Sequence, residues 1–181
     1  MRVPLITQAE LSPEQAAVAE EIMAVRGAPG APVVAAFGAL LHSPGAARAV
    51  AGVGAHVRFR SSIPDDVREA LILSVAGTLG AEYERIHHER IGRRAGLDDA
   101  QMAALRSGRL EAPPLSAAMT LAARLAREVV LPGGEEERLV AESRAMFGDP
   151  TTVELVITAG YYGMLAGVQR VLDITVDDDP R

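Results

Sequence analysis

The sequence GAEYERIHHERIGRRAGL, residues 80–97, organises the interpretation of the whole chain. Glycines stand near both ends of it, where helices commonly stop. Laid on a helix, one side is mostly apolar but also carries Glu84 and His88, one turn apart. The opposite side carries the charged residues Glu82, Arg85, Glu89 and Arg93. Because these charges are spaced for ion pairs, we expect that side to face water and the Glu84/His88 side to face inward.

The inward pair carries the first functional hypothesis. A carboxylate and an imidazole one helical turn apart, partly shielded from water, are suited to proton transfer. The same spacing also fits an interior histidine held by an ion pair, since structural and catalytic pairs look alike in sequence. The residues alone leave both interpretations open.

The run before this stretch predicts a central helix. Residues 61–66, SSIPDD, combine serines, a proline and two acids, which is typical of a helix start. Residues 70–81 then carry no charge, so the helix is expected to be buried on nearly every side. Glu69 stands at its entrance. It either faces water as a partner of the helix dipole or points inward, where it would join Glu84 and His88.

The composition predicts an all-α fold. Of the 181 residues 49% are hydrophobic but only 3% are aromatic, so the core must be built from the aliphatic side chains that pack between helices. Start and stop signals divide the chain into about eight helices. This length suits one domain, and we expect a single domain over residues 1–181.

Several classes of function are excluded or disfavoured by composition. The chain has no cysteine, hence no disulfide, thiolate nucleophile or cysteine-ligated metal. All 18 basic residues are arginine, which excludes Schiff-base chemistry on a lysine. The net charge of −6 argues against nucleic acid as a partner. Because we find neither a signal-peptide pattern nor an uncharged stretch long enough for a membrane span, we expect a cytoplasmic protein with no membrane partner.

Three separated blocks resemble the carboxymuconolactone decarboxylase family, which includes the alkyl hydroperoxidase D group. They are LLHSPGAARAVAGVGAHVRF at residues 40–59, PDDVREALILSVAGTLGAEYERIHHERIGRRAGL at 64–97 and VELVITAGYYGMLAGV at 153–168. The resemblance covers residues 33–172 as a core and leaves residues 1–32 as an N-terminal extension. It implies an all-helical fold that assembles as a homo-oligomer, typically a trimer or hexamer, with the active site near subunit contacts.

The peroxidase branch of that family uses Cys-x-x-Cys-x-x-x-His, with a glutamate twelve residues before the first cysteine. Aligned on His88, the two cysteines fall on Ala81 and Glu84, and the glutamate falls on Glu69. The proton-handling partners are present while both sulfurs are missing, and neither alanine nor glutamate can form a sulfenic acid or a disulfide. Peroxidase activity is therefore not expected.

The cysteine-free branch resembles the chain better, since many of its members carry Glu-Tyr-Glu and then a histidine, as residues 82–88 do. The Trp that commonly follows the second glutamate is Arg85 here, so a substrate contact through that ring is not carried over. The resemblance implies a decarboxylase-like enzyme acting on a small carboxylated lactone or carbonyl acid, without a cofactor. His88 would donate a proton to carbon, with Glu84 or Glu69 orienting it.

Candidates for substrate binding follow from what such a ligand needs. Arginines can hold carboxylates by forked hydrogen bonds, and aromatic rings can line a pocket. The candidates are Arg58, Arg60, Arg90, Tyr161, Tyr162 and His87.

Two further hypotheses stay open. A metal ion could be bound by His87, His88, Glu84 and Glu69, but adjacent residues on a helix point about 100° apart, so both histidines rarely reach one ion. We therefore expect no metal. The chain could also be a non-catalytic oligomeric protein that kept the pocket of the family and binds a small molecule there.

Overall fold

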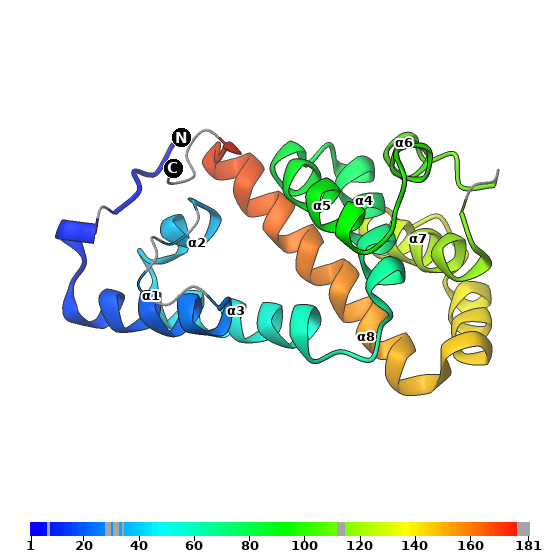
Figure 1. The fold of residues 1–181 in the computed structure, drawn as a ribbon, viewed down its shortest axis with the longest axis horizontal. Helices are drawn as coiled ribbons and strands as arrows, with labels where there is room; N and C mark the ends of the chain where they lie inside the picture. The colour runs from blue at the N-terminus through cyan, green and yellow to red at the C-terminus, as the bar shows by residue number, and fades with distance from the viewer. Residues whose placement is uncertain (7, 28–29, 31–32, 34, 112–114, 177–181) are drawn as a thin grey trace. The chain divides into compact units, whose positions relative to one another are not determined.

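The computed structural model describes residues 1–6, 8–27, 30, 33, 35–111 and 115–176. These residues form eight α-helices and one short 3-10 helix, without a strand among them, which confirms the predicted all-α class (Figure 1). The elements are η1 (Gln8–Glu10), α1 (Pro13–Val25), α2 (Ala35–Leu40), α3 (Pro44–Phe59), α4 (Asp65–Leu79), α5 (Glu82–Arg94), α6 (Asp99–Ser107), α7 (Ala117–Val130) and α8 (Glu136–Leu172). Helix α8 is divided by a kink at Gly148, whose backbone is not helical.

The described residues fall into two compact units. The first contains those from Met1 to Arg60 and from Val168 onward, and the second runs from Ser61 to Gly167. In the first unit, α1 packs on α3 around a buried cluster that includes Val18 and Phe37. The single domain expected over residues 1–181 stays a prediction, as do the 33–172 core and the 1–32 extension. Among the described helices, none combines the length and the apolar character that a membrane crossing requires.

Helix α4 is the centre of the second unit, with α5, α6 and α7 packed against it (Figure 1). Every residue from Val67 to Ala76 is buried, which confirms the prediction from the uncharged run, although the last turn of α4 is half-buried. Fully burying a side chain such as Leu71 contributes about 1.5–3 kcal/mol. The hydroxyl of Ser74 donates a 3.0 Å hydrogen bond to the carbonyl of Ala123 on α7, so this buried polar group is also satisfied.

The glycines near the two ends of the 80–97 stretch lie at helix ends, as predicted. Gly80 follows α4 with φ 63°, and Gly96 follows α5 with φ 98°. Glycine adopts such left-handed conformations without the penalty that a Cβ brings. The turn at Gly80 allows α5 to fold back against α4, and the turn at Gly96 separates α5 from α6.

Gly77 permits the close approach of α6 to α4. A Cβ built at this position would lie 2.8 Å from the carbonyl oxygen of Arg106 and 2.9 Å from its Cα, and backbone atoms cannot swing away as a side chain would. We expect Gly77→Ala to lower the free energy of unfolding by about 1–3 kcal/mol, because α6 must shift. Denaturant unfolding followed by circular dichroism would measure the change.

Gly167 offers a matched control for this substitution. It lies in α8 of the same unit, and nothing lies within 4 Å of a Cβ built there. Alanine at this site should stabilise the chain by up to about 1 kcal/mol, because alanine favours a helix more than glycine does. Equal effects at Gly77 and Gly167 would contradict the close approach.

Candidate active site

Glu69, Glu84 and His88 come together in the second unit, although they lie on two helices. Glu69 belongs to α4, whereas Glu84 and His88 lie one turn apart on the side of α5 that packs inward. Their exposed fractions are only 2%, 6% and 3%. Of the two orientations that the sequence left open for Glu69, the structure therefore shows the inward one. It brings together all three residues that were predicted as a catalytic group.

His88 lies between the two carboxylates. Its Nδ1 is 2.7 Å from Oε2 of Glu69, and its Nε2 is 3.6 Å from Oε2 of Glu84. An ionised carboxylate can only accept hydrogen bonds, so with Glu69 ionised the proton belongs on Nδ1 and is donated to Glu69. The contact with Glu84 is too long for a direct hydrogen bond. Nε2 is thus the ring atom at which His88 can take up or release a proton.

This arrangement suits a reaction in which His88 becomes positively charged. A carboxylate on one ring nitrogen fixes the orientation of the imidazole and stabilises the imidazolium form, as in other acid–histidine pairs. Here a second carboxylate, that of Glu84, faces the other nitrogen. Both carboxyl groups lie in an interior where electrostatic interactions are stronger than in water.

Tyr162 contributes an aromatic wall to this group. Its ring meets His88 edge to face, with centroids 4.9 Å apart and planes at 86°. Tyr161 packs in turn against Tyr162, at 5.2 Å and 88°. Both tyrosines lie on α8 and are buried. Of the two tyrosines predicted as pocket residues, Tyr162 thus contacts the imidazole directly.

The other predicted substrate contacts lie elsewhere in the described structure. The ring of His87 packs against Tyr83 at 4.6 Å, and Arg90 is exposed on α5. Arg58 and Arg60 belong to the first unit, where the Arg58 guanidinium lies 5.3 Å from the centre of the Phe59 ring and Arg60 is exposed. As substrate contacts, these four residues stay predictions.

Arg68 is the residue of this group that the sequence interpretation missed. It directly precedes Glu69 on α4 and is only 9% exposed, which is rare for arginine. One terminal nitrogen donates a 2.8 Å hydrogen bond to Oδ1 of Asp65, and Nε lies 3.6 Å from Oε1 of Glu69. One sequence feature could have indicated its burial: Arg68 stands just before the long uncharged run of residues 70–81.

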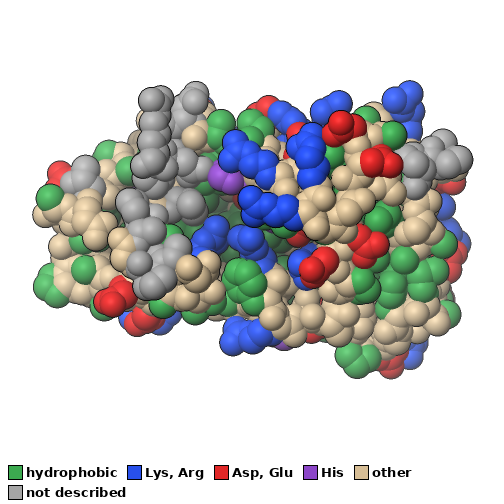
Figure 2. Space-filling view, in the orientation of Figure 1, with side chains coloured by type: hydrophobic (Ala, Val, Ile, Leu, Met, Phe, Trp, Pro, Cys, Tyr) green, Lys and Arg blue, Asp and Glu red, His purple; other side chains and the backbone are tan. Residues whose placement is uncertain are grey.

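The outer side of α5 carries the ion pairs that the sequence predicts. Arg85 binds Glu82 and also donates a 2.8 Å hydrogen bond to Glu89. These carboxylates raise the pKa of Arg85, and the guanidinium lowers the pKa of Glu82. In Figure 2, acidic and basic side chains lie next to one another in the upper right of the view. Glu82 and Arg93 are exposed, as expected of a solvated side, whereas Arg85 and Glu89 are half-buried.

The proposed metal ligands do not form a metal site in the described part of the chain. Among those residues no three histidine, aspartate or glutamate side chains are arranged to hold an ion. The Nδ1 of His88 is already bound to Glu69, and the neighbouring ring of His87 lies on Tyr83. The side chains present therefore do not fit the metal hypothesis.

A pocket of about 580 Å³ lies beside α7 and the first turns of α8. Its lining is mainly apolar and shares no residue with the group around His88. The lining residues are Leu115, Ala117, Thr120, Leu121, Arg124, Glu142, Ala145 and Met146. This volume lies within the range of small-molecule sites.

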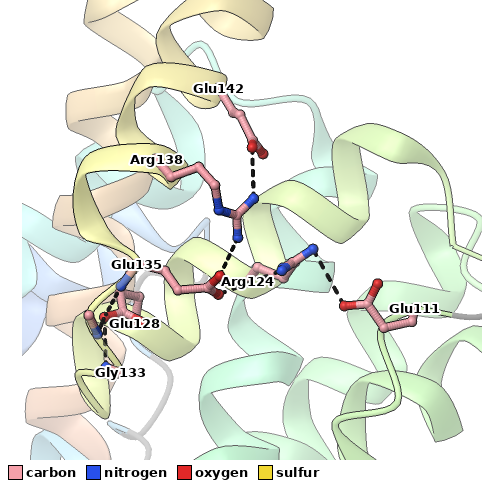
Figure 3. A network of polar contacts seen from close by, with 8 residues as sticks. Glu111, Arg124, Glu128, Gly133, Glu135, Arg138 and Glu142 are labelled. Atoms are coloured by element: carbon pink, nitrogen blue, oxygen red, sulfur yellow. Dashed lines mark hydrogen bonds and ion pairs between the residues drawn. The ribbon is translucent and has the colours of Figure 1, made fainter.

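Charged residues beside this pocket form an alternating chain (Figure 3). Arg124 lies 3.4 Å from Glu111 and 3.6 Å from Glu135. Arg138 holds Glu135 and Glu142 more tightly, at 2.5 and 2.7 Å. Glu142, which lines the pocket, and its neighbour Glu135 are thus both paired with arginine.

The Glu128 side chain binds the turn that connects α7 to α8 (Figure 3). Its Oε1 accepts hydrogen bonds from the backbone N–H groups of Gly133, Gly134 and Glu135, at 2.7, 2.7 and 3.1 Å. These bonds, led by the one from Gly133, lower the pKa of the Glu128 carboxyl. The carboxylate therefore has a structural role in this turn.

Comparison with known proteins finds a family match over part of the chain and a similar fold. Residues 44–128, a range that contains Glu69, Glu84 and His88, match the model of the carboxymuconolactone decarboxylase family. A similar solved structure is the crystal structure of the alkylhydroperoxidase AhpD core, an uncharacterized peroxidase-related protein from Ralstonia eutropha JMP134. The TM-score is 0.71 at 14% identity, covering 94% of this chain and 88% of that one. No curated protein sequence matches the chain.

Proposed function

We propose that the chain is a cysteine-free enzyme of the carboxymuconolactone decarboxylase family that uses His88 for general acid–base catalysis, a proposal supported by the match of residues 44–128 to the model of that family. The proposed substrate is a small carboxylated lactone or carbonyl acid. The observation that carries the proposal is the buried imidazole between two carboxylates, 2.7 Å from Glu69 and 3.6 Å from Glu84.

The proposed step is protonation of carbon after loss of carbon dioxide. The bond between the carboxylate carbon and its neighbour breaks, and its electron pair stays on the neighbour, delocalised toward the lactone carbonyl. Protonated His88 then gives the proton on Nε2 to that carbon and becomes neutral, while Nδ1 keeps its hydrogen bond to Glu69. A proton from solvent restores the imidazolium, so each turnover consumes one proton and releases one carbon dioxide.

The carboxylates have separate tasks in this step. Glu69 fixes the ring through Nδ1, and its buried position keeps water from competing for that hydrogen bond. Glu84 favours the charged ring from the other side, but at 3.6 Å it does not hold the Nε2 proton in a direct hydrogen bond. The proton can therefore pass to a substrate that reaches Nε2.

Turnover in heavy water tests this proposal. The purified chain is incubated with carboxylated γ-lactones and β-keto acids, and proton NMR follows the loss of substrate. We expect product that carries deuterium at the carbon that lost the carboxylate. The methyl esters of the same compounds serve as controls, because they cannot release carbon dioxide and should not react. Thiol-peroxidase activity is not proposed, because the chain has no cysteine.

A non-catalytic binding protein is the second candidate function, and the pocket beside α7 and α8 favours it. In that case the carboxylated γ-lactones and β-keto acids should bind without turnover. The NMR shifts of Leu121 and Met146, which line the pocket, should then change. Shift changes at Tyr162 together with product formation would instead support the enzyme.

We also propose that the chain forms a homo-oligomer, as the family resemblance implies. One side of α8 exposes apolar residues spaced three, four and seven apart, and a second copy would remove this surface from water. The residues are Val153, Val156, Ile157 and Met164. Light scattering should give a mass that is a multiple of 19.0 kDa, and a monomer at micromolar concentration would contradict the proposal.

A further inference from the structure

We propose that Arg68 is a positioning residue that holds Glu69 against His88, so that a relay from the exposed Asp65 through the buried Arg68 and Glu69 determines which ring nitrogen of His88 is free for proton transfer. The inference rests on the proposed function, because it assigns a role within the same site. It adds a residue that the Glu69, Glu84 and His88 pattern does not contain.

The contacts form a continuous chain from the start of α4 to α5. Asp65 accepts a 2.8 Å hydrogen bond from a terminal nitrogen of Arg68. The Nε of Arg68 lies 3.6 Å from Oε1 of Glu69, and the other oxygen of Glu69 lies 2.7 Å from Nδ1 of His88. Each oxygen of Glu69 therefore faces a different nitrogen, which restricts rotation of the carboxylate.

The burial of Arg68 calls for an explanation beyond packing. Its Nε is fully buried and has no hydrogen-bond partner at its described position. A buried donor without an acceptor is costly, and a charged one especially so. A shift of roughly 0.5 Å toward Glu69 would bring Nε to hydrogen-bond distance. A small movement would thus give Glu69 a second hydrogen bond, from Arg68 Nε to its Oε1, in addition to the one from His88.

Arg68 also supplies the permanent positive charge next to Glu69. Arginine stays protonated in proteins, whereas the charge of His88 changes during the proposed reaction. When His88 has given up its proton, Arg68 is the cation that still faces the Glu69 carboxylate. Ionised Glu69 can only accept a hydrogen bond, so the proton of neutral His88 stays on Nδ1 and Nε2 stays free. Without Arg68, a protonated Glu69 could donate to Nδ1 and move the ring proton to Nε2.

Nitrogen NMR of the imidazole tests this directly and needs no substrate. The chain is labelled with ¹⁵N-histidine, and the His88→Gln variant identifies which signals belong to His88 among the four histidines. In the wild type we expect neutral His88 to show a pyrrole-like Nδ1 and a pyridine-like Nε2. Arg68→Met should convert this pattern to the opposite tautomer or to a mixture, while Arg68→Lys, which keeps a charge, should preserve it.

Arg85→Met is the matched control. It removes an arginine with two acidic partners from the helix that carries His88, but its partners are Glu82 and Glu89. It should leave the His88 pattern unchanged. A folded Arg68→Met variant with the wild-type pattern would overturn the inference.

A second measurement covers the case in which Arg68→Met does not fold. With ¹⁵N-arginine in the otherwise unchanged chain, Glu69→Gln should move the Nε resonance of Arg68, whereas Glu84→Gln should not. An unmoved Arg68 resonance in Glu69→Gln would also overturn the inference. These readouts are independent of turnover. The activity assay can therefore contradict the proposed function while the NMR data support the relay, or the NMR data can contradict the relay while turnover is observed.

Discussion

Replacing His88 with glutamine is expected to lower turnover of a carboxylated lactone by about two to four orders of magnitude while the fold is retained. The amide N–H of glutamine can still donate a hydrogen bond to Glu69, which accepts one from Nδ1 in the native chain. An amide does not ionise near neutral pH and cannot act as a general acid or base, so the acid–base step is lost although the contact is kept. Comparison of kcat/KM for the two proteins, with substrate loss followed by NMR, measures the effect.

His56→Gln is the matched control for this experiment. His56 is exposed on α3 of the first unit, and no proposal assigns it a part in the reaction. Its replacement should leave kcat/KM unchanged. Full activity in a folded His88→Gln variant would show that the buried imidazole is structural, which is the second interpretation that the sequence allows.

The helices of the second unit were predictable because several local signals agree. In α4 the acidic start, the uncharged run and Gly80 at the end all point to the same helix. In α5 the charges and the apolar residues separate onto two sides at helical spacing. The division into two compact units has no comparable signal, because it depends on contacts between residues far apart in sequence.

The candidate site was predictable only where one helix carries both partners. Glu84 and His88 share a side of α5, so their spacing already places them together. Glu69 lies on another helix, and its orientation depends on how α4 packs, which spacing does not determine. The family pattern supplied the link between Glu69 and His88, and the structure shows the contact at 2.7 Å.

Arginine was the residue type for which sequence reasoning was least effective. Arg58, Arg60 and Arg90 were chosen for the chemistry of their side chains, and two of them are exposed. Arg68 was passed over because a charge in the first turn of a helix usually faces water. Its burial follows from α4 being enclosed by α5, α6 and α7, which is a property of the tertiary structure.

Replacing Glu69 with alanine is expected to lower the free energy of unfolding by about 3–5 kcal/mol. The substitution removes the acceptor for Nδ1 of His88 and leaves Arg68 buried beside an apolar methyl group. Removing one member of a buried charge group is costly, because Arg68 then loses its buried counter-ion and keeps only its contact with the exposed Asp65. Denaturant unfolding at neutral pH measures the loss, and a change below about 1 kcal/mol would mean that the carboxylate contributes no more than a surface group.

A double variant separates the loss of packing from the loss of charge pairing. Arg68→Met combined with Glu69→Leu removes both charges and refills most of the volume, so it should be more stable than Glu69→Ala alone. Glu137→Ala, at an exposed position in the first turn of α8, is the control and should change stability by no more than about 0.5 kcal/mol. If the double variant is instead less stable than Glu69→Ala, the charge that Arg68 retains without Glu69 cannot be the cause of the loss. The stability of α4 would then depend on Arg68 through its hydrogen bond to Asp65 rather than through Glu69.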